Sequence, residues 1–165
     1  MHPRNPIPVV SHWKTLSGHA VPDLPVAVEA FVGDADVMIH VGTDSKTRGG
    51  RTDYVTAVAV AQRGRGGRIV YRRERHRSVQ SLADRLFRET ELSIRVALGL
   101  SEHLAQDIVI HVDANEDGRH RSARYVQALA GMVVGYGFQV RVKPDAWCAT
   151  RVADYVVKEK HLRVA

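Results

Sequence analysis

The turns between the strand-like segments are the feature that most restricts how this chain folds. Three apolar segments rich in β-branched residues follow one another with only short, glycine-containing turns between them. Such turns join antiparallel neighbours, so the three segments are predicted to form a meander. The segments span 37–43, 54–62 and 68–75, and the turns span 48–51 and 64–67.

After the meander, strand-like and helix-like segments alternate. The segment 78–100 carries apolar residues at a helical period along one stripe and is the longest predicted helix. Alternation of this kind requires parallel strands joined by right-handed crossovers. We therefore predict an α/β fold whose five-stranded mixed sheet, first an antiparallel meander and then parallel strands, is flanked by helices. The remaining predicted strands are 108–113 and 138–143, and the remaining helices are 122–136, capped by Ser122, and about 150–159.

Residues 1–35 are predicted to be an N-terminal arm followed by a short helix. Prolines and a lack of periodicity mark 1–22 as the arm. Asp23 is a suitable helix cap, Pro25 suits the first turn, and the helix should end near Gly33. Residues 36–165 are predicted to form one domain, since a chain of this length buries enough surface for a single core.

The only cysteine, Cys148, excludes a disulfide framework and a cysteine-based zinc site. A thiol nucleophile is not supported either, because no orienting third group is identifiable. The sequence has no apolar run long enough for a membrane helix, and its first residues lack the order of a signal peptide. We expect a cytoplasmic protein that does not bind membranes.

The formal net charge is +6, and arginines cluster in the turns and in the third strand-like segment. Excess positive charge attracts polyanions through counterion release. An arginine-rich overall composition explains the charge equally well. The charge therefore supports a nucleic-acid partner without establishing one.

Two aspartates end apolar strand-like segments. Asp44 follows 37–43, and Asp113 ends 108–113. Ligands of open α/β sheets bind outside the carboxyl ends of strands. Period-two alternation puts Asp44 on the same face as His40, and Asp113 on the same face as His111. If the two strands are parallel neighbours, the carboxylates converge; for either aspartate alone, capping a turn is an ordinary role.

A third acid is expected from the helix 78–100. At 100° per residue, Glu89 lies about 80° from the centre of the apolar stripe and Glu91 about 120°, so Glu89 is preferred. A fourth acid, Asp154, lies in the last predicted helix, where its spacing from Arg151 and Lys158 also fits ordinary surface ion pairs.

Carboxylates held close together repel, at a cost of roughly 4 kcal/mol for a pair about 4 Å apart at an effective dielectric of 20. A cation should therefore accompany them. Oxygen ligands favour Mg²⁺ or Mn²⁺, and two ions about 3.5 to 4 Å apart are expected to clamp the attacking and leaving oxygens of a phosphodiester.

At this point the chain resembles the YkuK-like family, which belongs to the ribonuclease-H-like superfamily. The resemblance covers about 37–158, implies that 36–165 is a ribonuclease-H-like domain, and implies nuclease activity. It also implies that Asp44, Glu89, Asp113 and Asp154 are the catalytic, metal-binding acids. The matching segments are 41–45, Glu89 with Ser93, 111–113, 122–126, Gly131 with 137–138, 142–145 and 152–154.

Several other residues are candidates for supporting roles. Lys143 and Ser45 lie near strand ends where a scissile phosphate would bind, and for Lys143 a solvated lysine at a strand end is an equal alternative. Arg119 and Arg121 precede a helix start, which is a suitable phosphate site, although a basic loop with no ligand is an equal alternative. His40 and His111 could orient the metal ligands from the second layer, and ordinary hydrogen-bonded core histidines are the alternative.

The leading hypothesis is a metal-dependent nuclease that hydrolyses phosphodiesters by a two-metal mechanism, on RNA, DNA or a hybrid. The first alternative is a nucleic-acid-binding module that keeps the fold and does not cut. The second alternative is a phosphohydrolase of small molecules. The sequence leaves the oligomeric state open.

Overall fold

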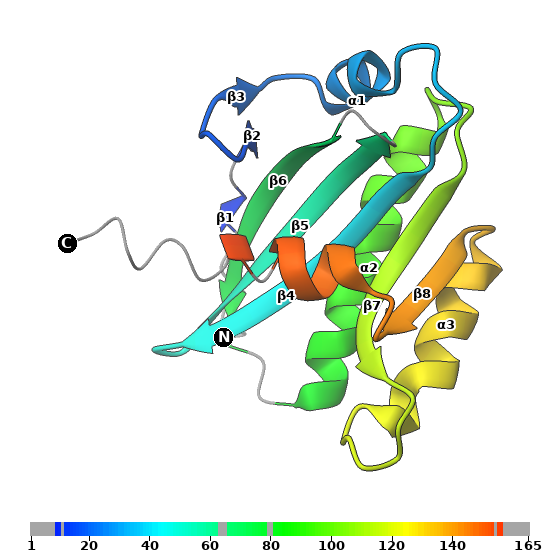
Figure 1. Ribbon diagram of the computed structural model, residues 1–165. Coiled ribbons are helices and arrows are strands. Elements are labelled where there is room, and N and C mark those ends of the chain that lie inside the picture. The colour runs from blue at the N-terminus through cyan, green and yellow to red at the C-terminus, as the bar shows by residue number, and fades with distance from the viewer. Residues whose placement is uncertain (1–8, 11, 63–65, 79–80, 154, 157–165) are drawn as a thin grey trace.

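The computed structural model describes residues 9–10, 12–62, 66–78, 81–153 and 155–156. Along this part of the chain one mixed sheet runs in the order β3-β2-β6-β5-β4-β7-β8, and β1 pairs with β6 beyond that path. Helices cover both of its faces (Figure 1). The strands are β1 (Val9–Val10), β2 (Trp13–Thr15), β3 (Ala20–Val21), β4 (Ile39–Arg48), β5 (Arg51–Gln62), β6 (Gly66–Arg77), β7 (Ile108–Asn115) and β8 (Gln139–Lys143).

The predicted meander is present, with longer strands than the sequence suggested. β4 pairs antiparallel with β5, and β5 with β6. Between β4 and β5, Gly49 and Gly50 have φ values of +53° and +75°. A two-residue turn with both φ values positive matches the twist of a hairpin, and glycine adopts it without strain. This turn fixes the register of the two strands as far as Arg48 opposite Arg51.

The parallel half of the sheet is also as predicted. β7 pairs in parallel with β4 on one side and with β8 on the other. β4 thus lies between an antiparallel and a parallel neighbour. The carboxyl ends of β4, β7 and β8 therefore share one end of the sheet.

The prediction of five strands is wrong. Five of the strands are the predicted ones, and the sheet also contains β2 and β3, with β1 beside them. β2 and β3 form a small hairpin, and β2 extends β6 through Lys14 opposite Tyr71 and Thr15 opposite Val70. These strands have two or three residues each, which is too short to produce a period-two pattern. Their stability comes from the exposed edge of β6.

The helices are α1 (Leu24–Val32), α2 (Leu82–Ser101), α3 (Val126–Gly135), a 3₁₀ turn η1 (Ala123–Tyr125) and a π-helix η2 (Cys148–Ala153). Asp23 caps α1 through its side chain, and Gly33 ends it, as predicted. Ser81 caps α2 in the same way.

Two helix predictions need correction. Ser122 does not cap a helix, because its hydroxyl accepts a hydrogen bond from the Asn115 amide at 3.1 Å, and the regular helix begins only at Val126. The last helix begins at Cys148 and not near Thr150, and its first six residues form a π-helix. Most of the predicted remainder of that helix lies outside the described residues.

The core has two layers because the strands alternate. Ile39, Val41, Val58, Ile108 and Ile110 belong to the larger cluster, which α1, α2 and α3 cover. The other face carries a smaller cluster, with Val55, Ala57 and Ala59 packed against Cys148 and Ala153 of η2. In Figure 1, α2 lies behind the sheet and η2 lies in front of it. Among the described residues, no helix is long and apolar enough to cross a membrane.

Candidate functional site

Asp44 and Asp113 lie on neighbouring parallel strands at the same end of the sheet. The paired part of β4 and β7 finishes with Gly42 opposite His111. Asp44 and Asp113 each lie two residues beyond this last pair. Both side chains are half-buried. The predicted adjacency of the two strands is therefore present.

Two buried histidines identify the face on which the aspartates lie. His40 Nδ1 is 3.0 Å from His111 Nε2, so both imidazoles project to one side of the sheet. It is the side that η2 covers, because the Cys148 amide donates a hydrogen bond to His111 Nδ1 at 3.3 Å. Since alternate residues of a strand share a face, Asp44 and Asp113 project to this side as well.

The histidine pair is neutral. Burial, and then the charge of Arg141, lowers the pKa of His40 to about 4. Burial, His40 and Arg141 lower the pKa of His111 to about 3. Because Nδ1 of His111 accepts from the Cys148 amide, the hydrogen-bond network assigns its proton to Nε2, which donates to His40. The Trp147 ring packs against both, with centroid distances of 4.6 and 5.0 Å.

Glu89 brings a third carboxyl group to this end of the sheet. It is 6% exposed on α2 and accepts a hydrogen bond from the Ser45 hydroxyl at 2.5 Å. Burial, then Asp44, and to a smaller extent Asp113, raise the pKa of Glu89 to about 8. Both aspartates are therefore near enough to affect it electrostatically.

The helical period correctly chose Glu89 over Glu91 as the residue that faces the sheet. The Glu91 side chain is 41% exposed and pairs with Arg88 and Arg95 on the outer side of α2. Buried hydrogen bonds between hydroxyl groups fix the position of α2 relative to β4. Thr43 on β4 lies 2.7 Å from the Ser93 hydroxyl and 3.0 Å from that of Thr56.

Lys143 is paired with Asp113. Its Nζ lies 2.6 Å from Asp113 Oδ1, with the lysine side chain 38% exposed and the aspartate 18%. The contact is an ion pair without hydrogen-bond geometry, and the buried Oδ1 has no hydrogen-bond partner among the described residues. The ammonium group of Lys143, which is partly exposed, thus balances the charge of the Asp113 carboxylate.

A cleft of about 760 Å³ opens beside this ion pair. Three cationic residues, Arg141, Lys143 and Arg151, line it together with the acidic residues Glu116 and Asp145, and Trp147 contributes an aromatic wall. The sequence analysis did not select Arg141 or Arg151 as site residues. The alternation of Arg141 with Lys143 in one strand was the signal that could have identified Arg141, because it puts both cations on one face.

The remaining predicted site residues lie elsewhere or outside the described part of the chain. Arg119 is exposed and pairs with Asp117 within the loop after β7. Arg121 is exposed in the same loop. Asp154 lies outside the described residues. Within the described ranges, no three His, Cys, Asp or Glu side chains are close enough to hold a metal ion as they stand.

Tyr54 is a buried polar residue that the sequence analysis missed. It lies opposite Ser45 on the α2 side of the sheet and is fully buried. Its hydroxyl has no hydrogen-bond partner in the described part of the chain. Burial, and then the charge of Glu89, raises its pKa to about 12. The hydroxyl is therefore protonated and belongs to the polar environment of Glu89.

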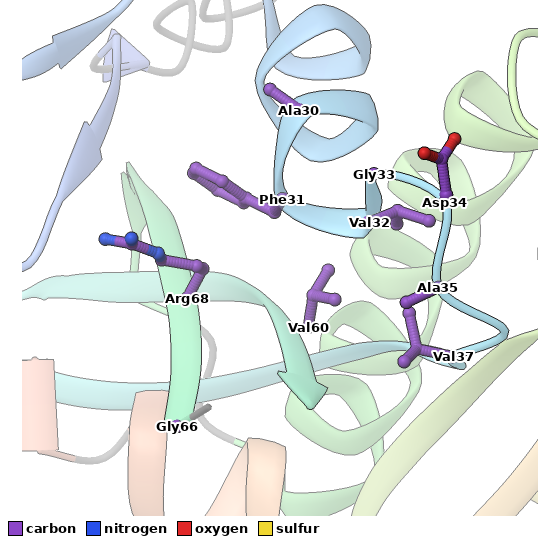
Figure 2. Close-up of a pocket in the computed structure, with 10 residues that line it drawn as sticks. All are labelled: Ala30, Phe31, Val32, Gly33, Asp34, Ala35, Val37, Val60, Gly66 and Arg68. Carbon is purple, nitrogen blue, oxygen red and sulfur yellow. The ribbon is translucent and has the colours of Figure 1, made fainter. Parts of the chain in front are cut away.

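A hollow larger than the cleft beside Lys143 lies away from the carboxylates. It measures about 1080 Å³ and lies between the end of α1, the segment before β4, the last part of β5 and the first part of β6. Figure 2 shows it lined largely by apolar residues, with Arg68 and Asp34 as its charged members. Val37 and Val60 place it at the opposite end of β4 and β5 from Asp44. It brings no catalytic groups together.

Comparison with known proteins agrees with the topology. A family model described as ribonuclease H-like matches residues 27–158, which is most of the chain. No curated protein matches the chain, and no solved structure does. The match includes β4, α2 and β7, the elements that carry Asp44, Glu89 and Asp113. With a meander, two parallel crossover strands and a match over most of its length, this chain belongs to the ribonuclease-H-like family.

Proposed function

We propose that this protein is a divalent-metal-dependent phosphodiester hydrolase acting on nucleic acid, with Asp44, Glu89 and Asp113 as metal ligands. The observation that carries the proposal is that the parallel neighbours β4 and β7 carry Asp44 and Asp113 at the end of the sheet where the buried Glu89 accepts a hydrogen bond from Ser45. The raised pKa of Glu89 supports it. A buried carboxyl group beside two further carboxylates is costly in the ionised state, and a bound cation removes that cost. Asp154 is proposed as the fourth ligand only because of the sequence resemblance to the YkuK-like family.

The donor atoms suit a hard cation. All three side chains offer carboxylate oxygens, which Mg²⁺ and Mn²⁺ prefer. Asp113 Oδ1 is a buried oxygen that has no hydrogen-bond partner in the described part of the chain and pairs with the Lys143 ammonium group. Two such ions would stabilise charge on the phosphodiester oxygens and activate a water molecule, so no side chain need be the nucleophile.

The other residues of the site have supporting roles in this proposal. If Asp113 held a metal, its carboxylate would no longer need the charge of Lys143, and the ammonium group would be available to pair with a substrate phosphate. Arg141 and Arg151 line the adjoining cleft and would hold the next phosphates. The neutral hydrogen-bonded pair His40 and His111 ties β4 to β7 without adding positive charge that would compete with the metal.

Cleavage of labelled RNA, DNA and RNA/DNA hybrids in Mn²⁺ or Mg²⁺ tests this function. Activity should disappear on chelation and fall by about 100-fold or more in Asp44→Asn, Asp113→Asn and Glu89→Gln, since even the outer partners of metal ligands are worth 10–100-fold. Glu91→Gln is the matched control, two residues away on the outer side of α2, and should cut like wild type. Equal activity of Asp44→Asn and wild type would sink the assignment.

The second candidate is a nucleic-acid-binding module that does not cut. The ion pair between Lys143 and Asp113 favours it, because a site already neutralised by lysine has less need of a metal. This alternative predicts salt-sensitive nucleic-acid binding with no Mn²⁺ uptake and no turnover. Calorimetric titration of the chain with Mn²⁺ separates the two.

A further inference from the structure

The hairpin end of the meander carries a row of three arginines in register. Arg48 on β4 is opposite Arg51 on β5, which is opposite Arg77 on β6. Directly opposite residues of antiparallel strands project to the same face. All three are exposed. They lie at the end of the β4–β5 hairpin that extends away from the helices (Figure 1).

The next row toward the middle of the sheet is also cationic on balance. It contains Lys46, Asp53 and Arg75. Arg75 donates to Asp53 at 2.6 and 2.9 Å, and Arg73 donates to it at 3.3 Å. The carboxylate of Asp53 is thus fully engaged by arginines, and Arg75 is held in place with 44% of its side chain exposed.

These two rows lead directly to the candidate site. The third row begins with Asp44, opposite Val55 on β5. Rows that share a face are two residues apart, or about 6.8 Å, so Arg48 lies about 14 Å along β4 from Asp44. An anion that follows β4 from the hairpin toward the carboxylates therefore meets a cationic row at each step.

The opposite face of the same strands lacks this charge. There, Thr47 is opposite Thr52, which is opposite His76, and the two threonine hydroxyls are 2.8 Å apart. The arginines are therefore not a uniform coating of the hairpin but lie on the face of Asp44. Like charges directly opposite one another destabilise a sheet, and a bound polyanion would relieve that repulsion.

We propose that Lys46, Arg48, Arg51, Arg75 and Arg77, here named the arginine rows, bind the phosphate backbone of a nucleic acid and guide it to the carboxylates. Charge complementarity and exposure select a nucleic acid as the occupant. Binding to the arginine rows does not depend on the proposed function; only the destination at Asp44 does.

Binding is measured by fluorescence anisotropy with labelled single-stranded RNA and DNA of about 20 nucleotides, longer than the usual single-strand site, in EDTA so that no cleavage occurs. Arg51→Ser/Arg77→Ser should weaken binding roughly 10- to 100-fold near 0.1 M salt. The slope of log K against log salt should fall by about 1.5, because each phosphate contact contributes about 0.7 to 0.9. Arg51→Lys/Arg77→Lys keeps the positive charge and should retain most of the wild-type affinity and most of the wild-type salt dependence.

The matched control is Arg95→Ser/Arg124→Ser, which removes the same charge from exposed positions on α2 and beside α3. It should bind like wild type. Equal losses in both double variants, or tighter binding to anionic lipid vesicles than to either oligonucleotide, would overturn the proposal. If wild type binds through the arginine rows but never cuts, the proposed function fails and the arginine rows stand. If Asp44→Asn abolishes cutting while Arg51→Ser/Arg77→Ser binds normally, the proposed function stands and the proposal for the arginine rows fails.

Discussion

A β-carbon on Gly42 would lie 2.5 Å from the backbone nitrogen of Ala149. Real β-carbons do not approach backbone that closely, so Gly42 is the residue that lets η2 pack directly on β4. Gly42→Ala should force η2 away from the sheet and lower the free energy of unfolding by about 1–3 kcal/mol, the usual cost of overpacking. Urea denaturation measures the loss.

The controls for this variant are helix glycines with open space around them. A β-carbon on Gly99 in α2 or Gly131 in α3 meets nothing within 4 Å. Gly99→Ala and Gly131→Ala should therefore raise stability, by roughly 0.5–1 kcal/mol each, from helix propensity. A Gly42→Ala protein as stable as these two would show that η2 is not held in this position.

Glu89 makes stability depend on pH in a direction opposite to that of most acids. Its pKa is raised from 4.5 to about 8 on folding. Between these values the folded chain holds a proton that the unfolded chain has released, so its contribution to stability is full below pH 4.5 and gone above pH 8. Without divalent metal, the free energy of unfolding should fall over this range by up to about 1.4 kcal/mol per pH unit.

Denaturation curves between pH 5 and 8 in EDTA test this dependence. Glu89→Gln should flatten it, because glutamine does not titrate, while Glu91→Gln on the outer side of α2 should leave the wild-type slope. Equal slopes in wild type and Glu89→Gln would mean that the carboxyl group is already ionised in the folded chain.

His40 and His111 act in the other direction. Their pKa values are lowered from 6.5 to about 4 and about 3, so the folded chain binds fewer protons than the unfolded chain in that interval. Their contribution to stability is complete above pH 6.5 and is lost as the pH falls through the folded values. Nitrogen-15 NMR should show both imidazoles neutral at pH 5.5, with the proton of His111 on Nε2. A charged ring at that pH would contradict the buried pair.

Local periodicity was enough to predict the main elements of the fold and the orientation of several side chains. The two short turns required the meander, and alternation along β4 and β7 put Asp44 and Asp113 on the faces of His40 and His111. The helical period correctly predicted that Glu89 faces the sheet, because α2 is long enough for its stripe of apolar residues to be well defined. These are properties of residues close together in sequence.

The features that could not be predicted depend on contacts between distant segments. β2 and β3 are too short for a pattern and exist because β6 offers an edge. Serine is a common helix cap, yet the Ser122 hydroxyl accepts a hydrogen bond from the amide of Asn115 at the end of β7. The pairing of Lys143 with Asp113 requires the register of β8 against β7, which no local pattern encodes.

Lys143 and a divalent metal should compete for Asp113. Lys143→Met removes the ammonium group and keeps the length of the side chain, so Mn²⁺ should bind more tightly. The gain should be about fivefold, since an ion pair with a partly exposed lysine is worth at most about 1 kcal/mol. Turnover at saturating Mn²⁺ should nevertheless fall, because the cation proposed to face the substrate phosphate is lost. Calorimetry and cleavage assays measure the two effects separately.

The opposite signs of these effects distinguish Lys143 from a residue that merely supports the fold. A damaged site would bind Mn²⁺ more weakly and cut more slowly, and a lysine without a role would change neither. Lys14→Met, at an exposed position on β2, provides the matched loss of charge and should leave both measurements at wild-type values. Weaker Mn²⁺ binding by Lys143→Met would mean that the ammonium group holds Asp113 in place for the metal and does not compete with it.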